Sequence, residues 1–391
     1  MIEETYFSQL CQRADELSGE MHDFLKQLVR IESPASFKEG VDEICRTIKA
    51  FCDNNQFKTT VYEFPAAGAS LISNVSETHD KEGAILLMGH MDTAQPVGAF
   101  GSEILTQDNQ YYYGPGVLDC KGGLVVALYA AKILKDAGYH TRPLRLVFSG
   151  DEESGHTSSL GKGREVYYQA SEGAIAAFNC ESGREDGYIA IARKGLFNVK
   201  IIVHGVAAHS GNNPEQGRNA ILEAAHKVIA IEKLTDFDGT TFNCGVIHGG
   251  KVQSAVPDYC EFLVCVRFRQ RGHARTALEQ LQQITDTVYV DGTSSEMIVT
   301  EEPHGPMEET QENLDLFHIY QRAAASLGDN AIKPYFAGGA SDAFYTTEKG
   351  VPTICGIGIR GQGQHSPKER AVIASLTERV KILIKAILLY E

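Results

Sequence analysis

An alternation of short apolar runs with a helical pattern over residues 84–179 constrains the fold most. Three runs have the length and composition of buried strands: AILLMG at 84–89, LRLVFS at 144–149 and AIAAFN at 174–179. Between the first two, GGLVVALYAAKILKDAG at 122–138 has the apolar spacing of a helix. Because continuous apolar strands separated by helices are typical of sheets covered on both faces, we expect a three-layer α/β domain with a mainly parallel sheet.

The segments on either side of this alternation fit the same domain. Apolar residues at helical spacing predict one amphipathic helix over the first thirty residues, ended by Ser33-Pro34, and a second helix over 39–54. The same texture returns late in the chain, with a helix at 311–327, a strand at 351–357 and a last helix at 373–390.

From about Gly195 the pattern changes to strands in which apolar and polar residues alternate, such as FNVKIIVHG and CEFLVCVRFR. Two helical segments, near 217–233 and 273–287, and a closing strand, EMIVT, complete the order strand, helix, strand, strand, helix, strand. This is the order of a ferredoxin-like α+β unit. We therefore expect an inserted domain, and the predicted divisions are 1–194, 195–302 and 303–391.

Charge and cysteine content narrow the classes of function. The formal net charge is −15 and no basic run could neutralise phosphates, so we expect no nucleic-acid partner. No apolar stretch approaches the length of a membrane span, and the acidic start MIEETYFSQLCQRADEL does not resemble a signal peptide. The nine cysteines include no C-x-x-C pair and fit reduced thiols. We therefore expect a cytoplasmic protein without a membrane partner.

Candidate metal ligands follow the ends of four apolar runs. They are His90 and Asp92 after LLMG, Asp151, Glu152 and Glu153 after LVFSG, Glu181 after AIAAFNC, and His365 beyond TICGIG. A further candidate, Asp119, lies in GPGVLDCKGG before a helix. Because ligands of an open parallel sheet bind beyond the carboxyl ends of its strands, these side chains could converge on one crevice.

The chemical types of these residues favour a metal site. Imidazoles and carboxylates without thiolates suit catalytic zinc, cobalt or manganese. Asp92 lies two residues from His90, on the same side of an extended chain, where a carboxylate commonly orients a ligating imidazole. Each residue also has a structural interpretation, since an acidic run such as Asp151–Glu153 suits the first turn of a helix. The recurrence at successive strand ends favours the metal site.

Other signals indicate no second chemistry. GIGIRG at 356–361 matches a dinucleotide-binding fingerprint, but QGQHSP follows where that fold needs a helix. Cys120 and Cys180 adjoin candidate ligands and are interpreted as small apolar filler, with a ligand or redox role as the alternative.

Six motifs, in this order, closely resemble those of the dinuclear zinc exopeptidase family. They are GHMDT, GPGVLDCKGG, DEESG, HGVAAHSGNNPEQGRNAI, GGASD and the late His365. The family contains glutamate carboxypeptidase, aminoacylase, acetylornithine deacetylase, succinyl-diaminopimelate desuccinylase and the tri- and dipeptidases. The resemblance covers nearly the whole chain, and HSGNNPEQGRNAI and GGASD are nearest to the glutamate carboxypeptidase branch.

By matching position, the resemblance assigns one metal ion to His90 and Glu181 and the other to Glu153 and His365, with Asp119 as the bridge. It implies two zinc ions per chain, with cobalt or manganese as alternatives. Such a pair holds a bridging water, lowers the pKa of that water and polarises the substrate carbonyl.

The resemblance also assigns catalytic roles. Glu152 matches the general base that takes the proton of the bridging water and returns it to the leaving amine. Asp92 matches the carboxylate behind the first histidine.

The inserted domain is implied to act as a lid and a dimerisation domain that completes the site. His209 resembles the histidine that reaches across a homodimer to stabilise the oxyanion, and its alternative is a surface loop histidine. Arg267 resembles the arginine that binds the free carboxylate of the substrate, although Arg269 lies on the same face and stays open. Further candidates for substrate contact are Asn243 and the backbone of Gly338 and Gly339.

The function implied is cleavage of an amide bond next to a free carboxylate in a small peptide. An N-acyl-amino-acid deacylase uses the same machinery and stays open as an alternative. An inactive binding homologue would be expected to lose Glu152 or a ligand, and all are present. A thiol-dependent enzyme would be inhibited by alkylation and indifferent to chelators, and we expect the reverse.

Overall fold

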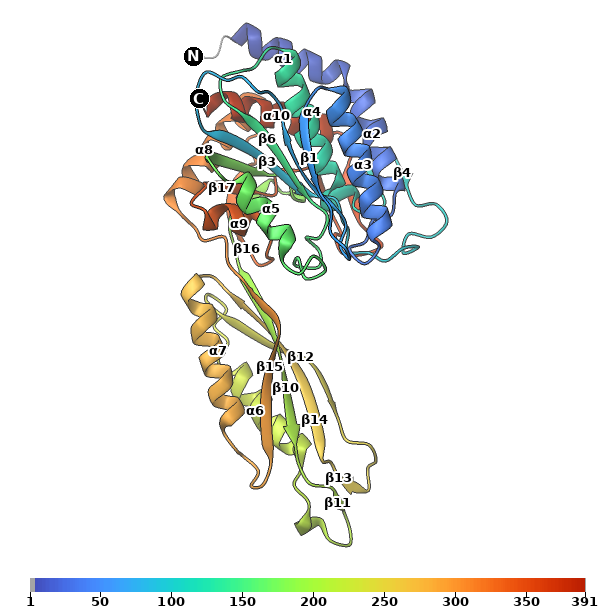
Figure 1. Ribbon diagram of the computed structural model, residues 1–391, viewed down its shortest axis with the longest axis vertical. Coiled ribbons are helices and arrows are strands. Elements are labelled where there is room, and N and C mark those ends of the chain that lie inside the picture. The colour runs from blue at the N-terminus through green and yellow to red at the C-terminus, as the bar shows by residue number, and fades with distance from the viewer. Residues whose placement is uncertain (1–3, 391) are drawn as a thin grey trace. The chain divides into compact units, whose positions relative to one another are not determined.

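The computed structural model describes residues 4–390 and contains two compact units (Figure 1). Unit 1 comprises the chain up to Ala192, Glu309–Phe336 and the chain from Ser341 onward. Unit 2 comprises Arg193–Glu308 and Ala337–Ala340. Among the helices described, none combines the length and apolar character that crossing a membrane requires.

Unit 1 is built on an eight-stranded sheet in the order β1-β2-β6-β3-β7-β17-β9-β16. The four strands β6, β3, β7 and β17 pair in parallel, whereas β1–β2, β2–β6 and β17–β9 pair antiparallel. The bounds are β1 Lys58–Tyr62, β2 Ser70–Asn74, β3 Ala84–His90, β6 Leu144–Ser149, β7 Ala174–Asn179, β9 Tyr188–Arg193, β16 Lys333–Ala337 and β17 Thr353–Cys355.

Helices cover both faces of this sheet, and every residue of the central strand β3 is therefore buried. Ile85 and Leu87 of β3 belong to one apolar cluster with α1, α2, α3, α4, α8 and α10, whereas Leu86 and Met88 pack with α5 and α9. The expected three-layer α/β fold with a parallel centre is therefore confirmed. The bounds are α1 Glu4–Glu16, α2 Ser18–Arg30, α3 Lys38–Asn54, α4 Gly122–Asp136, α5 Lys162–Ala170, α8 Gln311–Ser326, α9 Ala343–Glu348 and α10 Ser375–Leu389.

The first thirty residues differ from the expectation of a single helix. They form two helices, α1 and α2, that meet at Leu17. Ser18 and Gly19 follow directly, and such small residues weaken the continuity of a helix. Leu10 and Met21 still belong to the same core cluster, so the apolar face continues across the break.

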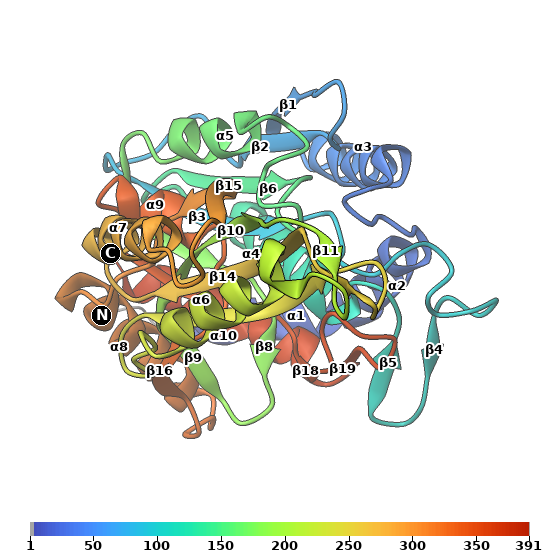
Figure 2. The same ribbon diagram turned by 90° about the horizontal axis from the view of Figure 1, so that it is seen from below.

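A second, five-stranded sheet in unit 1 has the order β4-β5-β19-β18-β8 and is visible as neighbouring short strands in Figure 2. The bounds are β4 Thr106–Gln107, β5 Tyr111–Tyr113, β8 Gly183–Arg184, β18 Arg360–Gln362 and β19 Arg370–Val372. Because β18 and β19 pair antiparallel, the connection between them places His365 at one end of this sheet.

Unit 2 has the ferredoxin-like order expected of the inserted domain. Its four-stranded sheet has the order β12-β14-β10-β15, with antiparallel pairs throughout. Alternate residues of β10, including Phe197 and Val199, are buried in one cluster with Ala224 of α6 and Leu281 of α7, so both helices cover the same face (Figure 1). The bounds are β10 Gly195–His204, β11 Ala208–His209, α6 Ala220–Glu232, β12 Thr241–Gly249, β13 Ala255–Val256, β14 Tyr259–Phe268, α7 Arg271–Asp286 and β15 Ser294–His304.

Candidate metal centre

His90 ends β3, the central strand, with its imidazole buried. Its Nδ1 lies 3.0 Å from the backbone oxygen of Asp92 and 3.4 Å from Asp92 Oδ1. The backbone oxygen can only accept a hydrogen bond, so Nδ1 carries a hydrogen and Nε2 faces the site. The Oδ2 atom of Asp92 accepts from the N–H of Glu153 at 2.8 Å, so Asp92 also holds the turn after β6.

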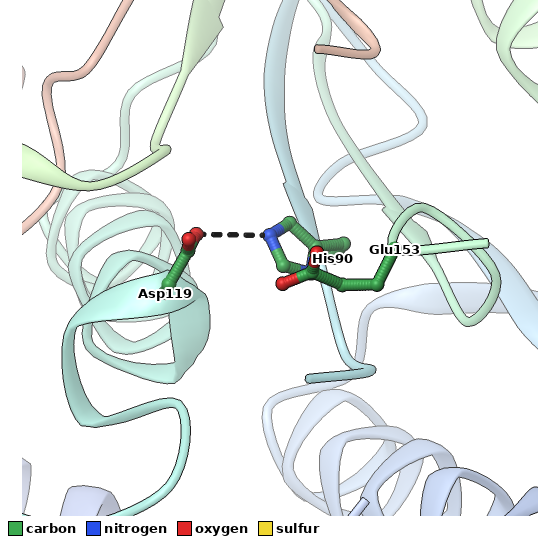
Figure 3. Close-up of side chains that lie close together, drawn as sticks. All are labelled: His90, Asp119 and Glu153. Atoms are coloured by element: carbon green, nitrogen blue, oxygen red, sulfur yellow. Dashed lines mark hydrogen bonds and ion pairs between the residues drawn. The ribbon is translucent and has the colours of Figure 1, made fainter. Parts of the chain in front are cut away.

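Asp119 lies between two histidines. Its Oδ1 is 3.2 Å from His90 Nε2, and its Oδ2 is 3.2 Å from His365 Nε2. Figure 3 shows His90, Asp119 and Glu153 around a common space, with the Asp119 contact dashed. Each carboxylate oxygen of Asp119 therefore faces a different imidazole, as a bridging carboxylate requires.

The remaining candidate ligands divide between the two histidines. Glu153 Oε2 lies 3.3 Å from His365 Nε2, and Glu181 Oε1 lies 3.8 Å from His90 Nε2. Two groups have ligand atoms within 4.8 Å of one another, His90 with Asp119 and Glu153, and His90 with Glu152 and Glu181. The structure thus brings together all six of the metal-binding and general-base candidates.

The backbone that carries Asp119 is held by residues that the sequence patterns did not single out. The buried carboxylate of Glu369 accepts from the N–H groups of Gly116, Leu118 and Asp119 at 3.1, 2.8 and 2.9 Å. Lys121, also buried, donates to the carbonyl oxygens of Ile31 and Pro115. The only signal for Glu369 in the sequence is its position four residues after His365. That position does not reveal a hydrogen-bond partner 250 residues away.

Gly123 permits a close approach behind the site. A Cβ atom at this position would lie 1.7 Å from the carbonyl oxygen of Cys180, which precedes Glu181. Only glycine therefore allows the start of α4 to contact the chain that carries Glu181.

Glu152 lies in the turn after β6 rather than in the first turn of a helix. Residues 152–161 form turns, and α5 begins only at Lys162. Burial raises the pKa of Glu152 well above its ordinary value, nearby His90 opposes that rise, and the carboxylate of Glu181 adds to it. A carboxyl group of raised pKa beside candidate ligands is typical of a general base.

The neighbouring acidic residue, Asp151, has a structural role. Its Oδ2 accepts from the N–H of Ser159 at 2.8 Å, and its Oδ1 accepts from the hydroxyl of Ser154. Asp151 therefore closes the turn that carries Glu152 and Glu153.

The donor set fits a pair of divalent cations. The ligand atoms are imidazole nitrogens and carboxylate oxygens, and among the residues described Glu153 Oε1 is buried without a hydrogen-bond partner. Buried carboxylates at this density need cations, and oxygen with nitrogen donors suits zinc, cobalt or manganese.

Cys120 is occupied with the backbone and fits the interpretation as filler. Its Sγ accepts from the N–H of His90 at 3.1 Å and lies 3.3 Å from the His90 carbonyl oxygen. Burial raises the pKa of the Cys120 thiol to about 12, so a thiolate ligand is disfavoured in the metal-free protein. Burial likewise raises the pKa of Cys180 well above its ordinary value.

Unit 2 brings three of the substrate-contact candidates together. Arg267, on β14, donates from Nη1 to the carbonyl oxygen of Gly338 at 3.1 Å. Asn243, on β12, is exposed and pairs with Cys265, two residues from Arg267, so it shares the face of the arginine. The Nη1 atom of Arg193 donates to the carbonyl oxygen of Gly339 at 3.3 Å.

His209 lies in unit 2 on the short strand β11, exposed at its end. Its Nδ1 accepts from the N–H groups of Gly211 and Asn212, both at 3.1 Å. Because Nδ1 is an acceptor, the neutral ring carries its hydrogen on Nε2, so His209 presents a hydrogen-bond donor to its surroundings.

Comparison with known proteins places these features in context. Residues 86–389 match the sequence profile of the Peptidase family M20/M25/M40. The chain is 27% identical over 375 residues to carboxypeptidase G2 of Pseudomonas sp. (strain RS-16), covering 93% of this chain and 88% of that protein. It is 31% identical over 195 residues to an acetylornithine deacetylase of Myxococcus xanthus, covering 46% of this chain and 48% of that protein.

Solved structures share the fold. The aminopeptidase PepT of Bacillus cereus has a TM-score of 0.79 at 21% identity, covering 95% of this chain and 98% of that one. The M20 family metallo-carboxypeptidase Sso-CP2 of Sulfolobus solfataricus has a TM-score of 0.75 at 17% identity, covering 95% and 99% of the two chains.

Proposed function

The chain belongs to the Peptidase family M20/M25/M40 and is a metal-dependent hydrolase, and from this premise we propose that it is an exopeptidase with two zinc ions that cleaves an amide bond next to a free carboxylate. The observation that carries the proposal is the contact of the two Asp119 oxygens with the imidazoles of His90 and His365. A carboxylate whose two oxygens face different imidazoles is placed as the shared ligand of a two-metal site would be.

In the proposed site, His90 and Glu181 would hold one ion, Glu153 and His365 would hold the other, and Asp119 would be shared. The contacts of Glu181 with His90 and of Glu153 with His365 support this division. When bound, the ions supply Lewis-acid polarisation of the substrate carbonyl and a lowered pKa of water.

Glu152 is the proposed general base. Its carboxylate takes a proton from the attacking water and delivers that proton to the nitrogen of the leaving amine. Asp92 orients the imidazole of His90 through Nδ1 and holds the turn of Glu152 through the N–H of Glu153.

Unit 2 supplies the proposed substrate contacts. The guanidinium of Arg267 binds the free carboxylate in a bidentate manner, and its contact with Gly338 joins two of the candidate positions. His209 donates from Nε2 to the oxyanion, which its two backbone donors to Nδ1 support. Asn243 lies beside Arg267 on the same face and is proposed as a further substrate contact.

A second candidate function is an N-acyl-amino-acid deacylase. The similarity to an acetylornithine deacetylase favours it, whereas the similarity to carboxypeptidase G2 covers more of the chain and favours the carboxypeptidase. Both reactions hydrolyse an amide bond to a carboxylic acid and an amine. The two candidates are separated by the group on the acyl side of the bond.

A substrate screen tests the proposal directly. The zinc-loaded protein would be assayed with dipeptides, tripeptides and N-acetyl amino acids, and with matched substrates whose carboxylate is converted to an amide. We expect cleavage of peptides with a free carboxylate and loss of cleavage with the amide. Cleavage of the acylated amino acids alone would establish the deacylase instead.

Glu152→Gln tests the proposed base. The change keeps the shape of the side chain but removes its proton acceptor, so we expect kcat to fall about 100- to 10,000-fold. Zinc content, measured by atomic emission, should stay near that of the unaltered protein, because Glu152 is not assigned as a ligand. Glu165→Gln, at an exposed position of α5, is the matched control and should leave kcat unchanged. Full activity of Glu152→Gln would remove Glu152 from this role.

A further inference from the structure

His156 and Asp342 form a buried contact for which the proposed reaction has no role. His156 Nε2 lies 2.7 Å from Asp342 Oδ1, and the two residues are 1% and 3% exposed. Because a carboxylate accepts, Nε2 carries the hydrogen of the imidazole. Asp342 ends the GGASD motif and stands immediately before α9, whereas His156 lies 186 residues earlier.

The loop of His156 is the loop that carries Glu152 and Glu153. The N–H of His156 donates to the carbonyl oxygen of Asp151 at 2.9 Å, and the carbonyl oxygen of His156 accepts from Gly161 at 2.8 Å. His156 is thus bonded into the middle of the turn on both sides. Its side chain fastens this turn to α9, an element from a distant part of the sequence.

Aromatic rings fix the imidazole in place. The ring of His156 meets the rings of Tyr345 and Tyr167 edge-on, with centroids 5.3 and 6.2 Å apart. The hydroxyl of Tyr167 donates to the carbonyl oxygen of Gly89 at 3.0 Å. Since Gly89 precedes His90, the ring of Tyr167 links the imidazole of His156 to the strand that carries His90.

We propose that Asp342 and His156 are positioning residues that hold the turn of Glu152 and Glu153 in register with His90 on β3. This inference rests on the proposed general-base role of Glu152. A carboxylate–imidazole pair that supports ligand-bearing segments without touching substrate affects metal geometry and turnover, typically by about 10- to 100-fold. Loss of such a pair has little effect on substrate affinity.

Asp342→Ala, His156→Ala and the double variant test the pair. We expect kcat to fall about 10- to 100-fold in each, with KM within about twofold, because only the catalytic turn is displaced. The double variant should lose no more than either single variant if the two side chains act as a unit. Asp342→Asn keeps an acceptor oxygen for His156 and should restore most of the lost kcat.

A second readout does not depend on turnover. We expect the visible absorption of the cobalt-loaded Asp342→Ala protein to shift, because Glu153 is displaced relative to its ion. The control is Asp329→Ala, which removes another largely buried carboxylate of unit 1, the partner of Arg360. It should lower the thermal midpoint while leaving kcat and the cobalt spectrum unchanged. If Asp342→Ala does not fold, His156→Ala and Asp342→Asn carry the same comparison.

The outcomes separate this inference from the proposed function. An unshifted cobalt spectrum and the same kcat in Asp342→Ala as in Asp329→Ala would overturn the positioning role. If Glu152→Gln is inactive at the same time, only the inference fails. Full activity of Glu152→Gln would overturn the proposed function itself.

Discussion

At the residue scale, Asp119 and His365 set the protonation of the candidate metal centre. Burial acts to raise the pKa of Asp119, but hydrogen bonds with His365 and His90 outweigh it and hold that pKa well below its usual range. The same contact with Asp119, together with one from Glu153, raises the pKa of His365 to about 11. In the metal-free protein the ring of His365 therefore stays protonated at neutral pH.

Zinc binding should release the proton of His365. A metal ligand must be neutral at the coordinating nitrogen, so the ion and the proton compete, and metal affinity should rise with pH through the neutral range. Isothermal titration at pH 7 in buffers with different ionisation enthalpies measures the released protons. His365→Ala should release fewer. A binding heat that is the same in every buffer would contradict the prediction.

Local sequence was informative about ligand types and less so about what holds them. His90, Glu153 and Glu181 follow strands recognisable from their apolar runs, so their convergence could be expected before any coordinates. Glu369 and Asp342 could not be found in this way. Their partners lie about 250 and 186 residues away, and no periodic pattern reports contacts at that separation.

At the element scale, a buried ion pair within α6 of unit 2 places a lysine against the end of α7. Lys227 and Glu223 are almost fully buried and lie 3.0 Å apart. Lys227 also donates to the carbonyl oxygens of Ile284 and Thr285 at the end of α7, both at 2.9 Å. The lysine thus satisfies carbonyl groups that the helix leaves without partners.

Lys227→Met should destabilise unit 2 strongly. It leaves the charge of Glu223 buried and unpaired, a loss of about 3 to 5 kcal/mol in the free energy of unfolding. The matched control is Lys200→Met, because Lys200 pairs with Glu261 at 3.4 Å and both side chains are partly exposed. That change should cost about 1 kcal/mol or less. Urea unfolding of both variants measures the difference, and equal losses would show that the buried pair has no special weight.

The elements themselves were predicted well where their patterns are long. The strands β3, β6 and β7 and the helices α3, α4, α8 and α10 coincide with expected segments. The five-stranded sheet was not expected, because strands of two or three residues carry no measurable alternation. Its β18–β19 connection nevertheless carries His365.

At the scale of the whole molecule, unit 2 has exposed apolar residues that would suit the homodimer implied by the family resemblance. The exposed apolar residues include Ile221, Leu222 and Ile229 on α6 and Val246 and Ile247 on β12. β12 is also an edge strand, with unpaired backbone groups on its outer side. Exposed apolar residues on a helix and on an edge strand are typical of an interface.

The expected dimer predicts complementation between two inactive variants. If His209 acts in the partner's site, a refolded mixture of Glu152→Gln and His209→Ala contains dimers with one complete site, so part of the activity should return. Neither variant alone should be active. Light scattering should show a dimer for the unaltered chain and a monomer for Ile247→Lys. A mixture without activity, formed from proteins that are dimeric, would exclude the exchange of His209.

The sequence by itself determined the layered α/β architecture, the ferredoxin-like order of the inserted segment and the chemical types of the candidate ligands. These follow from periodicity and from motifs, which are properties of short stretches of chain. The tertiary structure alone decided that the two oxygens of Asp119 face different histidines. It also decided that Glu369 and Asp342 support the segments bearing the ligands. Such contacts depend on where distant segments meet, and only the packed chain specifies that meeting.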